Sequence, residues 1–165
     1  MTITIRQAVP ADVREMKSLI DPYVPSRKLL IKSLVTLYED VQEFLVATED
    51  GRVVACGALH VLWDDLAEIR TLAVSESYLR RGLGSMILES LVERARSLGL
   101  QRLFCLTFET EFFGSHGFVE IEGTPVDPQV YAELLASYDD GVAEFLDLER
   151  VKPNTLGNVR MLRVL

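Results

Sequence analysis

The sequence predicts an α/β domain around a mixed, mostly antiparallel sheet that contains one parallel strand pair. Strand-like apolar segments separated by short turns fill the centre of the chain, which indicates an antiparallel meander. A long amphipathic helix then connects segment 67–74 to segment 102–108, and strands joined by a helical crossover run parallel. The apolar stripe of this helix precedes Gly99 and consists of Ile87, Leu88, Leu91, Val92, Ala95 and Leu98.

The N-terminal elements follow from periodicity and from helix-breaking residues. Alternating apolar residues predict a first strand at 2–6, and Asp12 with Glu15 has the spacing of a capping box at a helix start. The proline-containing segment 21–25 ends that helix. Apolar residues at helical spacing then predict a second helix over 27–42.

The segments 44–48 and 53–62 form a predicted β-hairpin, because Asp50-Gly51 between them favours a tight turn. The strand 67–74 returns after a second turn. The C-terminal part is predicted to contain a short helix at 110–116, a strand at 118–122, a helix at 128–138, no regular element over 139–157 and a closing strand at 159–165.

Length and composition predict a single domain over residues 1–165. Apolar residues make up 48% and charged residues 25% of the 165, which is an ordinary globular balance. No segment predicts a signal peptide or a membrane span, and Cys56 and Cys105 have neither metal-ligand nor disulfide spacing, so we expect a cytoplasmic protein with free thiols. The net charge of −8 argues against nucleic acid or an anionic membrane as a partner.

A glycine-rich loop lies between strand 67–74 and the long helix. Gly82 and Gly84 expose backbone N–H groups at the helix start, where an anion binds well. Arg80 and Arg81 add the positive charge that a diphosphate needs in an acidic chain. The loop lacks both the Gly-Lys-Ser/Thr of a P-loop and the third glycine of a dinucleotide fingerprint, so it predicts a pyrophosphate site of another kind.

Three features in order resemble the GNAT superfamily of N-acetyltransferases: Leu72-Ala-Val74, Arg80-Arg-Gly-Leu-Gly-Ser85 and Phe112-Phe-Gly-Ser-His-Gly-Phe118. The resemblance implies a GNAT-type fold, acetyl-CoA as co-substrate, no metal, and direct transfer to an amine in a ternary complex. It also implies that the backbone of Leu72, Ala73 and Val74 holds the thioester carbonyl and the pantetheine arm. The pyrophosphate is expected on Leu79, Arg80, Arg81, Gly82, Leu83, Gly84 and Ser85.

The resemblance also suggests which residues act in catalysis. Glu68 opens the strand that leads into the loop, where these enzymes often place a glutamate that acts as a base through water. His60 on the neighbouring strand is the alternative base. The position of the usual general acid, a tyrosine, carries Phe113, so we expect Thr107 or water to protonate the leaving thiolate, unless no acid is needed.

A narrower resemblance, to the acetyltransferase domain of bacterial N-acetylglutamate synthases, concerns the acceptor. It covers the segments 29–34, 41–46, 54–59 and 98–107 and, more weakly, 158–162. It implies a standalone enzyme that acetylates the α-amino group of glutamate or glutamine in arginine biosynthesis. The resemblance places Lys32 and Ser33 at the position of an Arg-Ser pair of these enzymes. Because the acceptor carboxylate needs cations close to the acetyl group, Arg160 and Arg70 are further candidates beside Lys32.

Glu109 departs from the synthase pattern. A carboxylate there would repel a side-chain carboxylate of the acceptor, which favours glutamine or a neutral or cationic amino acid over glutamate. Two other readings stay open. One is a GNAT enzyme for another amine (an aminoglycoside, a polyamine or a protein N-terminus), and the other is a non-catalytic acyl-CoA sensor. Oligomeric state is also open, with a homodimer as one candidate.

Overall fold

Within the residues that the structure describes, the strands form one seven-stranded sheet in the order β1-β2-β3-β4-β5-β7-β6. We describe it from a computed structural model, which covers residues 2–26, 29 and 32–165. The pairs β1·β2, β2·β3, β5·β7 and β6·β7 are antiparallel, whereas β4 and β5, which α3 connects, form the parallel pair. The predicted fold class, a mixed and mostly antiparallel sheet flanked by helices, is therefore confirmed.

The chain divides into two compact units, residues 1–60 with 68–99 and residues 61–67 with 100–165. A single domain over 1–165 stays a prediction, and each unit is described by itself. The first unit holds β1 (Ile3–Gln7), η1 (Pro10–Asp12), α1 (Val13–Ile20), η2 (Asp21–Tyr23), α2 (Leu34–Glu39), η3 (Val41–Glu43), β2 (Phe44–Glu49), most of β3 (Arg52–Val61) and β4 (Leu66–Val74), η4 (Glu76–Tyr78) and α3 (Leu83–Ser97).

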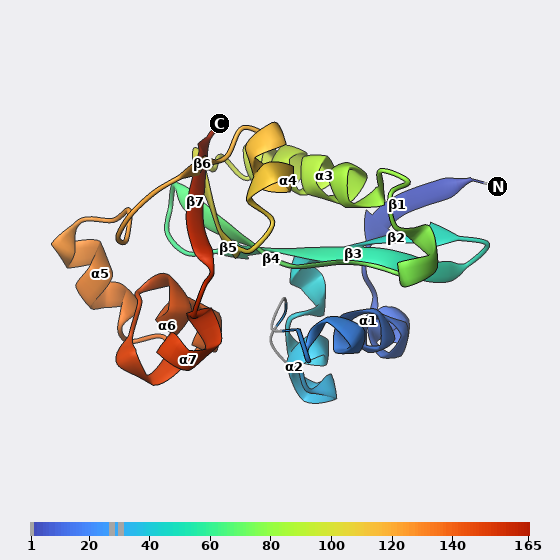
Figure 1. Cartoon of the computed structure of the whole chain (residues 1–165), viewed down its shortest axis with the longest axis horizontal. Helices are drawn as coiled ribbons and strands as arrows, with labels where there is room; N and C mark the ends of the chain where they lie inside the picture. The colour runs from blue at the N-terminus through green and yellow to red at the C-terminus, as the bar shows by residue number, and fades with distance from the viewer. Residues whose placement is uncertain (1, 27–28, 30–31) are drawn as a thin grey trace. The chain divides into compact units, whose positions relative to one another are not determined.

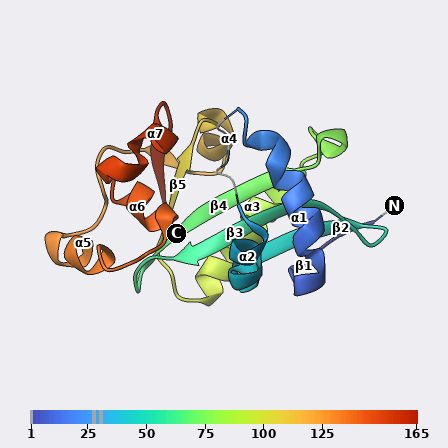
Figure 2. The same cartoon turned by 90° about the horizontal axis from the view of Figure 1, so that it is seen from below.

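Helices cover both faces of the strands in the first unit. Figure 1 shows α3 on one face of β2 and β3 and the pair α1 and α2 on the other; Figure 2 views the sheet from the α1–α2 side. The core on that side joins Val13 and Met16 of α1 and Leu37 of α2 to Cys56 and Ala58 of β3. Burial of these apolar side chains is what holds the two helices on the sheet.

Gly57 faces the opposite side, toward α3. A Cβ atom at this position would lie 2.7 Å from Cγ2 of Ile87, 3.0 Å from Cδ1 of Leu72 and 3.1 Å from Cδ1 of Leu91. The absence of a side chain here therefore allows α3 to pack closely on β3 and β4. The glycine-rich loop precedes α3 directly, so this packing also fixes where the loop lies.

The predicted hairpin is present and has the expected turn. Asp50 and Gly51 have φ values of 50° and 77°, and two consecutive positive φ values are what a type I′ turn requires. The turn thus sets the register in which Glu49 faces Arg52.

The start of α1 is not capped as predicted. Instead of capping α1, the Asp12 carboxylate accepts hydrogen bonds from Arg6 at 2.7 and 2.9 Å and from the Val9 N–H at 2.8 Å. Glu15 accepts from the Val53 N–H at 3.0 Å. The Arg6 guanidinium holds the pKa of Asp12 below its usual value. Both carboxylates tie α1 to strands, and these distant partners are the reason the capping-box prediction was wrong.

The second predicted helix is too long. The observed α2 spans Leu34–Glu39, and Ser33 is its N-cap, accepting from the Thr36 N–H at 3.2 Å. The capping serine explains why the helix begins there rather than earlier. Residues 27, 28, 30 and 31 of the predicted helix lie outside the described residues.

The second unit holds strands β5, β6 and β7 and a C-terminal group of short helices. Its elements are β5 (Arg102–Thr107), α4 (Thr110–Ser115), β6 (Val119–Glu120), α5 (Pro128–Leu134), α6 (Asp140–Phe145), η5 (Glu149–Val151), α7 (Lys152–Thr155) and β7 (Val159–Val164). The core of this unit packs Phe104 of β5 edge-on against Phe145 of α6, with ring centroids 4.8 Å apart.

The prediction of no regular element over 139–157 was wrong, because α6, η5 and α7 occupy it. These helices are each six residues or shorter, too short to show a hydrophobic period. Asp139 caps α6 by accepting from the Val142 N–H at 2.8 Å. Within the described part of the chain, no helix is long and apolar enough to cross a membrane.

Candidate functional site

The glycine-rich loop presents the start of α3 as an anion site. Gly82 is the N-cap with φ 81°, and the first bond inside the helix runs from the Met86 N–H to the Gly82 carbonyl at 3.0 Å. The N–H groups of Leu83 and Gly84, in the first helical turn, therefore have no acceptor inside α3. A Cβ on Gly82 would meet nothing within 4 Å. Open space, oriented N–H groups and the positive end of the helix dipole fit a diphosphate.

Two arginines flank this helix start. Arg80 and Arg81 are both exposed, and Arg80 adopts a left-handed backbone with φ 64°. The Arg81 guanidinium lies 4.9 Å from the centre of the Tyr78 ring. Tyr78 in turn donates its hydroxyl hydrogen to Glu49, which raises the pKa of Tyr78. The stacking holds Arg81 near the loop while its charge stays accessible to solvent.

The strand that leads into the loop is irregular at Thr71. This residue has φ 54°, a conformation that is strongly disfavoured for a β-branched side chain. Before it, Glu68 and Arg70 share one face and contact each other; after it, Leu72 faces Gly57 and α3 while Ala73 joins the core of α1 and α2. The side-chain alternation thus shifts by one residue, as at a β-bulge, and such strain is typical of functional sites.

The expected backbone positions Leu72, Ala73 and Val74 lie directly after this bulge. The Val74 carbonyl accepts a hydrogen bond of 2.5 Å from the hydroxyl of Tyr23 in η2. Burial raises the pKa of Tyr23, so its hydroxyl keeps its proton. A ligand that also uses this carbonyl would share it with Tyr23.

Glu68 and Arg70 form a buried ion pair. The distance from Arg70 Nε to Glu68 Oε1 is 2.7 Å, and the two side chains are 10% and 7% exposed, respectively. The sequence prediction gave these residues separate roles, a base and a carboxylate ligand. The structure instead binds them to each other, so Arg70 positions the carboxylate of Glu68.

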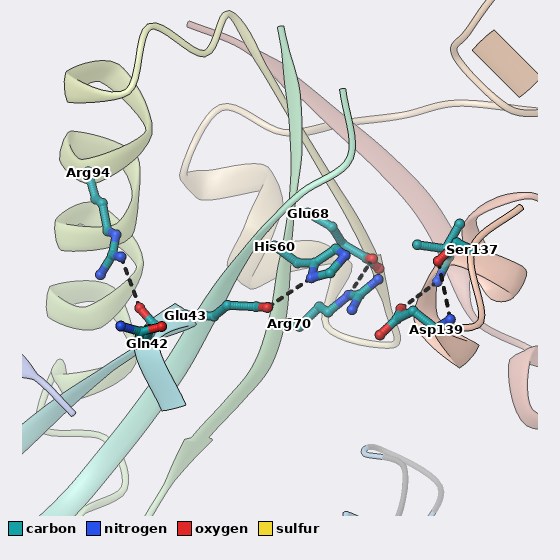
Figure 3. A network of polar contacts seen from close by, with 9 residues as sticks. Gln42, Glu43, His60, Glu68, Arg70, Arg94, Ser137 and Asp139 are labelled. Carbon is teal, nitrogen blue, oxygen red and sulfur yellow. Dashed lines mark hydrogen bonds and ion pairs between the residues drawn. The ribbon is translucent and has the colours of Figure 1, made fainter. Parts of the chain in front are cut away.

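His60 lies beside this pair and has a carboxylate of its own. Its Nδ1 is 2.8 Å from Glu43 Oε1. Figure 3 shows the ring of His60 between Glu43 on one side and the Glu68–Arg70 pair on the other. All four side chains belong to the first unit.

The predicted acceptor ligands Lys32 and Ser33 are adjacent at the start of α2. The backbone carbonyl of Lys32 accepts from Lys17 Nζ at 2.9 Å, and Lys17 is also paired with Asp21 at 3.0 Å. The Ser33 hydroxyl caps α2 and lies 2.9 Å from the Thr36 hydroxyl. Helix α1 thus anchors the backbone at Lys32, and the capping role of Ser33 leaves its substrate role a prediction.

In the second unit, Thr107 ends β5 and Glu109 follows two residues later. The Thr107 hydroxyl is buried and accepts from the Glu109 N–H at 2.8 Å, which leaves its own hydrogen available for donation. Glu109 is exposed at the N-terminus of α4. Phe113 on the same helix is buried edge-on against Phe118, with centroids 5.2 Å apart, so it serves the core.

Arg160 on β7 is held by the second unit itself. Its Nε donates to the Gly123 carbonyl at 2.8 Å and its terminal nitrogens donate to the carbonyls of Glu144 and Phe145. Its guanidinium lies 4.9 Å from the centre of the Phe104 ring. These contacts give Arg160 a structural role at the end of α6, and its predicted role toward the acceptor stays a prediction.

Residues 13–121 match the family described as "Acetyltransferase (GNAT) family". A Mycobacterium tuberculosis amino-acid acetyltransferase is 58% identical over 164 residues, which cover 98% of this chain and 94% of that protein. Other amino-acid acetyltransferases match over 27% to 30% of their own length. The chain therefore belongs to the GNAT acetyltransferase family, and it is an acyltransferase whose co-substrate is acetyl-CoA.

Solved structures agree with this assignment. The M. tuberculosis protein Rv2747 in complex with CoA and NLQ has a TM-score of 0.95 and 58% identity, covering 98% of this chain and 99% of that one. The N-acetylglutamate synthase of Neisseria gonorrhoeae complexed with coenzyme A and N-acetyl-glutamate has a TM-score of 0.79 and 26% identity, covering 100% of this chain and 35% of that one. The resemblance to the synthase domain is confirmed.

Sequence reasoning missed three features of the site. The contacts of Tyr23 with Val74 and of Glu43 with His60 join residues that are 51 and 17 positions apart, respectively. No local sequence pattern predicts such contacts. The left-handed backbone at Thr71 was missed because a threonine gives no sign of it, unlike a glycine.

Among the residues that the structure describes, no group of three or more His, Cys, Asp or Glu side chains is arranged to hold a metal ion.

Proposed function

We propose that the chain transfers the acetyl group of acetyl-CoA directly to the α-amino group of glutamine or glutamate, as a standalone enzyme of arginine biosynthesis. The observation that carries the proposal is the loop at the start of α3, with open space at Gly82 and two exposed arginines. It is supported by the names of the relatives, amino-acid acetyltransferase, and by the NLQ and N-acetyl-glutamate complexes of two similar proteins.

In the proposed reaction, the N–H groups of residues 83–85 and the charges of Arg80 and Arg81 bind the diphosphate. The backbone of Leu72, Ala73 and Val74 aligns the thioester, and the bulge at Thr71 breaks the regular strand just before them. Holding both reactants in one ternary complex removes most of the entropic cost of the encounter.

Glu68 is the proposed base, acting through a water molecule. An α-ammonium group has a pKa of about 8 or higher, so most of the acceptor is protonated at neutral pH and must lose a proton before it attacks. The neutral amine then forms the C–N bond, the C–S bond breaks as the thiolate leaves, and the nitrogen gives its second proton to water. Thr107 or water supplies the proton to sulfur, and a thiolate leaves readily because a thiol pKa is only about 8.5.

For the acceptor carboxylates we propose Lys32 and Ser33, with Arg70 and Arg160 as further cations. In this scheme Arg70 attracts the acceptor carboxylate while it stays paired with Glu68, and Arg160 does so from its position on β7. Glu109 is the proposed discriminator against a second carboxylate, because two like charges about 4 Å apart repel by about 1 kcal/mol even in water.

The test is a thiol-release assay with acetyl-CoA and each of the twenty amino acids. We expect release with glutamine above all, and release with glutamate to increase about tenfold relative to glutamine in the variant Glu109→Gln. The matched control is Glu111→Gln, which removes a second exposed carboxylate two residues further along, in the first turn of α4. No release with any amino acid would contradict the proposed function. An unchanged glutamate-to-glutamine ratio would remove Glu109 as discriminator.

A further inference from the structure

A proton that Glu68 takes from the acceptor must still reach solvent. The Glu68 side chain is 7% exposed and its neighbour Arg70 is 10% exposed, so direct exchange with bulk water is restricted. The side chains of His60 and Glu43 are 20% and 29% exposed. Exposure therefore rises along the series Glu68, His60, Glu43.

The hairpin between β3 and β4 places His60 opposite Glu68. The Leu62 N–H donates to the Leu66 carbonyl at 2.9 Å, and counting back along both strands from this pair makes residues 60 and 68 cross-strand partners. Directly opposite residues in an antiparallel pair point to the same face. Figure 3 agrees, since the His60 ring is drawn beside Glu68.

The partner of Nδ1 fixes the form of the His60 ring. A carboxylate only accepts hydrogen bonds, so the 2.8 Å contact with Glu43 requires a hydrogen on Nδ1. In the neutral ring Nε2 then carries the lone pair and is ready to accept a proton. The opposite sides of the ring thus face a proton source, Glu68, and a stabilising anion, Glu43.

We propose that His60, oriented by Glu43, relays the proton from Glu68 to solvent in each turnover. This inference rests on the proposed role of Glu68 as base. The carboxyl proton of Glu68 passes through a water molecule to His60 Nε2, and the resulting imidazolium is paired with Glu43 until bulk water takes the same proton from Nε2. Glu68 and His60 both return to their starting forms, and no bond other than those to the proton changes. His60 and Glu43 are thus positioning and relay residues, because they act through Glu68.

The charged groups of the first unit around His60 favour such a relay. Glu43 of η3 and Glu68 of β4 are acidic and stabilise a transient positive charge on the ring, and the opposing charge of Arg70 of β4 is offset by its ion pair with Glu68.

The test compares wild-type enzyme with His60→Ala, His60→Gln and Glu43→Gln in the thiol-release assay. With His60 removed, we expect kcat to fall about 10- to 100-fold, because removal of the proton becomes the slow step. Added imidazole at constant pH and ionic strength should restore part of the kcat of His60→Ala in a concentration-dependent way, while wild-type kcat stays constant. Glu43→Gln should lower kcat less and leave the KM for acetyl-CoA unchanged. His116→Gln, at the only other histidine of the chain, is the control and should keep wild-type kcat.

The relay is contradicted if kcat of both His60 variants equals that of wild type. It is also contradicted if kcat of His60→Ala falls but does not increase with added imidazole. In either case an active wild type with an impaired Glu68→Gln variant would leave the proposed function intact. A wild type that acetylates no amino acid would overturn the proposed function and the relay together. Circular dichroism shows whether His60→Ala is folded, and the near-isosteric Glu43→Gln supplies the test if it is not.

Discussion

At the scale of single residues, Glu68 carries most of the proposed chemistry. Its carboxylate is buried and oriented by Arg70 at 2.7 Å. It therefore has one fixed orientation, whereas a solvent-exposed carboxylate samples several. A base that is held in place in this way needs no reorganisation when the acceptor arrives.

The change Glu68→Gln removes the base while keeping an oxygen that accepts from Arg70. We expect kcat to fall about 100-fold or more and to rise with pH over the range in which the acceptor amine loses its proton, because the variant depends on acceptor that is already neutral. The measurement is kcat from pH 5 to 9 by thiol release. Glu93→Gln serves as control, since Glu93 is an exposed carboxylate on α3 paired with Arg96. An unchanged pH profile in Glu68→Gln would remove Glu68 as base.

The sequence indicated Glu68, Thr107 and the loop residues but not their partners. The spacing of a motif can be read directly from one sequence. The contacts of Glu68 with Arg70 and of His60 with Glu43 depend on how strands and turns are folded. The same limit produced the wrong capping box at Asp12, whose carboxylate found Arg6 of β1 instead of its own helix. Partner choice was therefore the part that local pattern could not predict.

At the scale of elements, the loop and α3 act together. The positive φ of Gly82 lets the chain turn into the helix, and its missing Cβ leaves the helix start open. The backbone cost of a Cβ at Gly82 can be separated from its effect on diphosphate binding by comparison with Gly51, which has a similar φ and equally open surroundings in the β2–β3 turn.

Gly82→Ala and Gly51→Ala should each destabilise the protein by about 1 kcal/mol, because both place a Cβ in the left-handed region. We expect a raised KM for acetyl-CoA, about tenfold, from Gly82→Ala alone, since its Cβ projects where the diphosphate binds. Thermal unfolding and initial rates measure the two effects. An equal KM in both variants would place the diphosphate elsewhere.

Gly57→Ala tests the packing of α3 on β3. An added Cβ would approach Ile87 Cγ2 to 2.7 Å, and overpacking of this kind costs about 1–3 kcal/mol. The melting temperature should drop, and kcat should fall with it because α3 carries the loop. Gly114→Ala, in α4 with nothing within 4 Å, is the control and should be neutral or slightly stabilising. A Gly57→Ala variant as stable as wild type would contradict the close packing.

Element prediction succeeded where the pattern was long or chemically explicit. The hairpin was marked by Asp50-Gly51, and α3 by an apolar stripe that continues over about three turns. It failed for α2, shortened by the cap at Ser33, and for α6 and α7, which are only six and four residues long. Helices of that size depend on tertiary packing more than on their own sequence.

At the scale of the whole molecule, both cysteine thiols are shielded from solvent and from reagents dissolved in it. Cys56 and Cys105 are both buried, and burial raises the pKa of Cys56 to about 12. The raised value favours the folded state at low and neutral pH. This contribution is lost as pH rises from the ordinary thiol pKa of about 8.5 toward 12, where the unfolded chain ionises first.

Native protein should therefore show no rapid reaction with a disulfide reagent at pH 8, and denatured protein should show two thiols per chain, as its composition requires. The measurement is absorbance of the released thiolate with and without guanidinium chloride. It also validates the thiol-release assay, because an unreactive enzyme adds no background. Fast labelling of the folded chain would contradict the buried position of Cys56.

The family of the whole molecule was predictable because three motifs, at residues 72–74, 80–85 and 112–118, occur in the order that is typical of one superfamily. The identity of the acceptor was harder to predict from the sequence. Its proposed ligands Lys32, Glu109 and Arg160 come from three distant parts of the chain, and Arg160 is engaged with the carbonyls of Gly123, Glu144 and Phe145.

The most direct test of the account is the mass of the product. Purified protein is incubated with acetyl-CoA carrying a ¹³C-labelled acetyl group and with glutamine, and the amino-acid product is fragmented in a mass spectrometer. We expect the labelled acetyl group on the α-nitrogen, and no labelled product from an acceptor whose α-amino group is blocked. Labelled acetyl on a different amine, or none on any amino acid, would contradict the central claim.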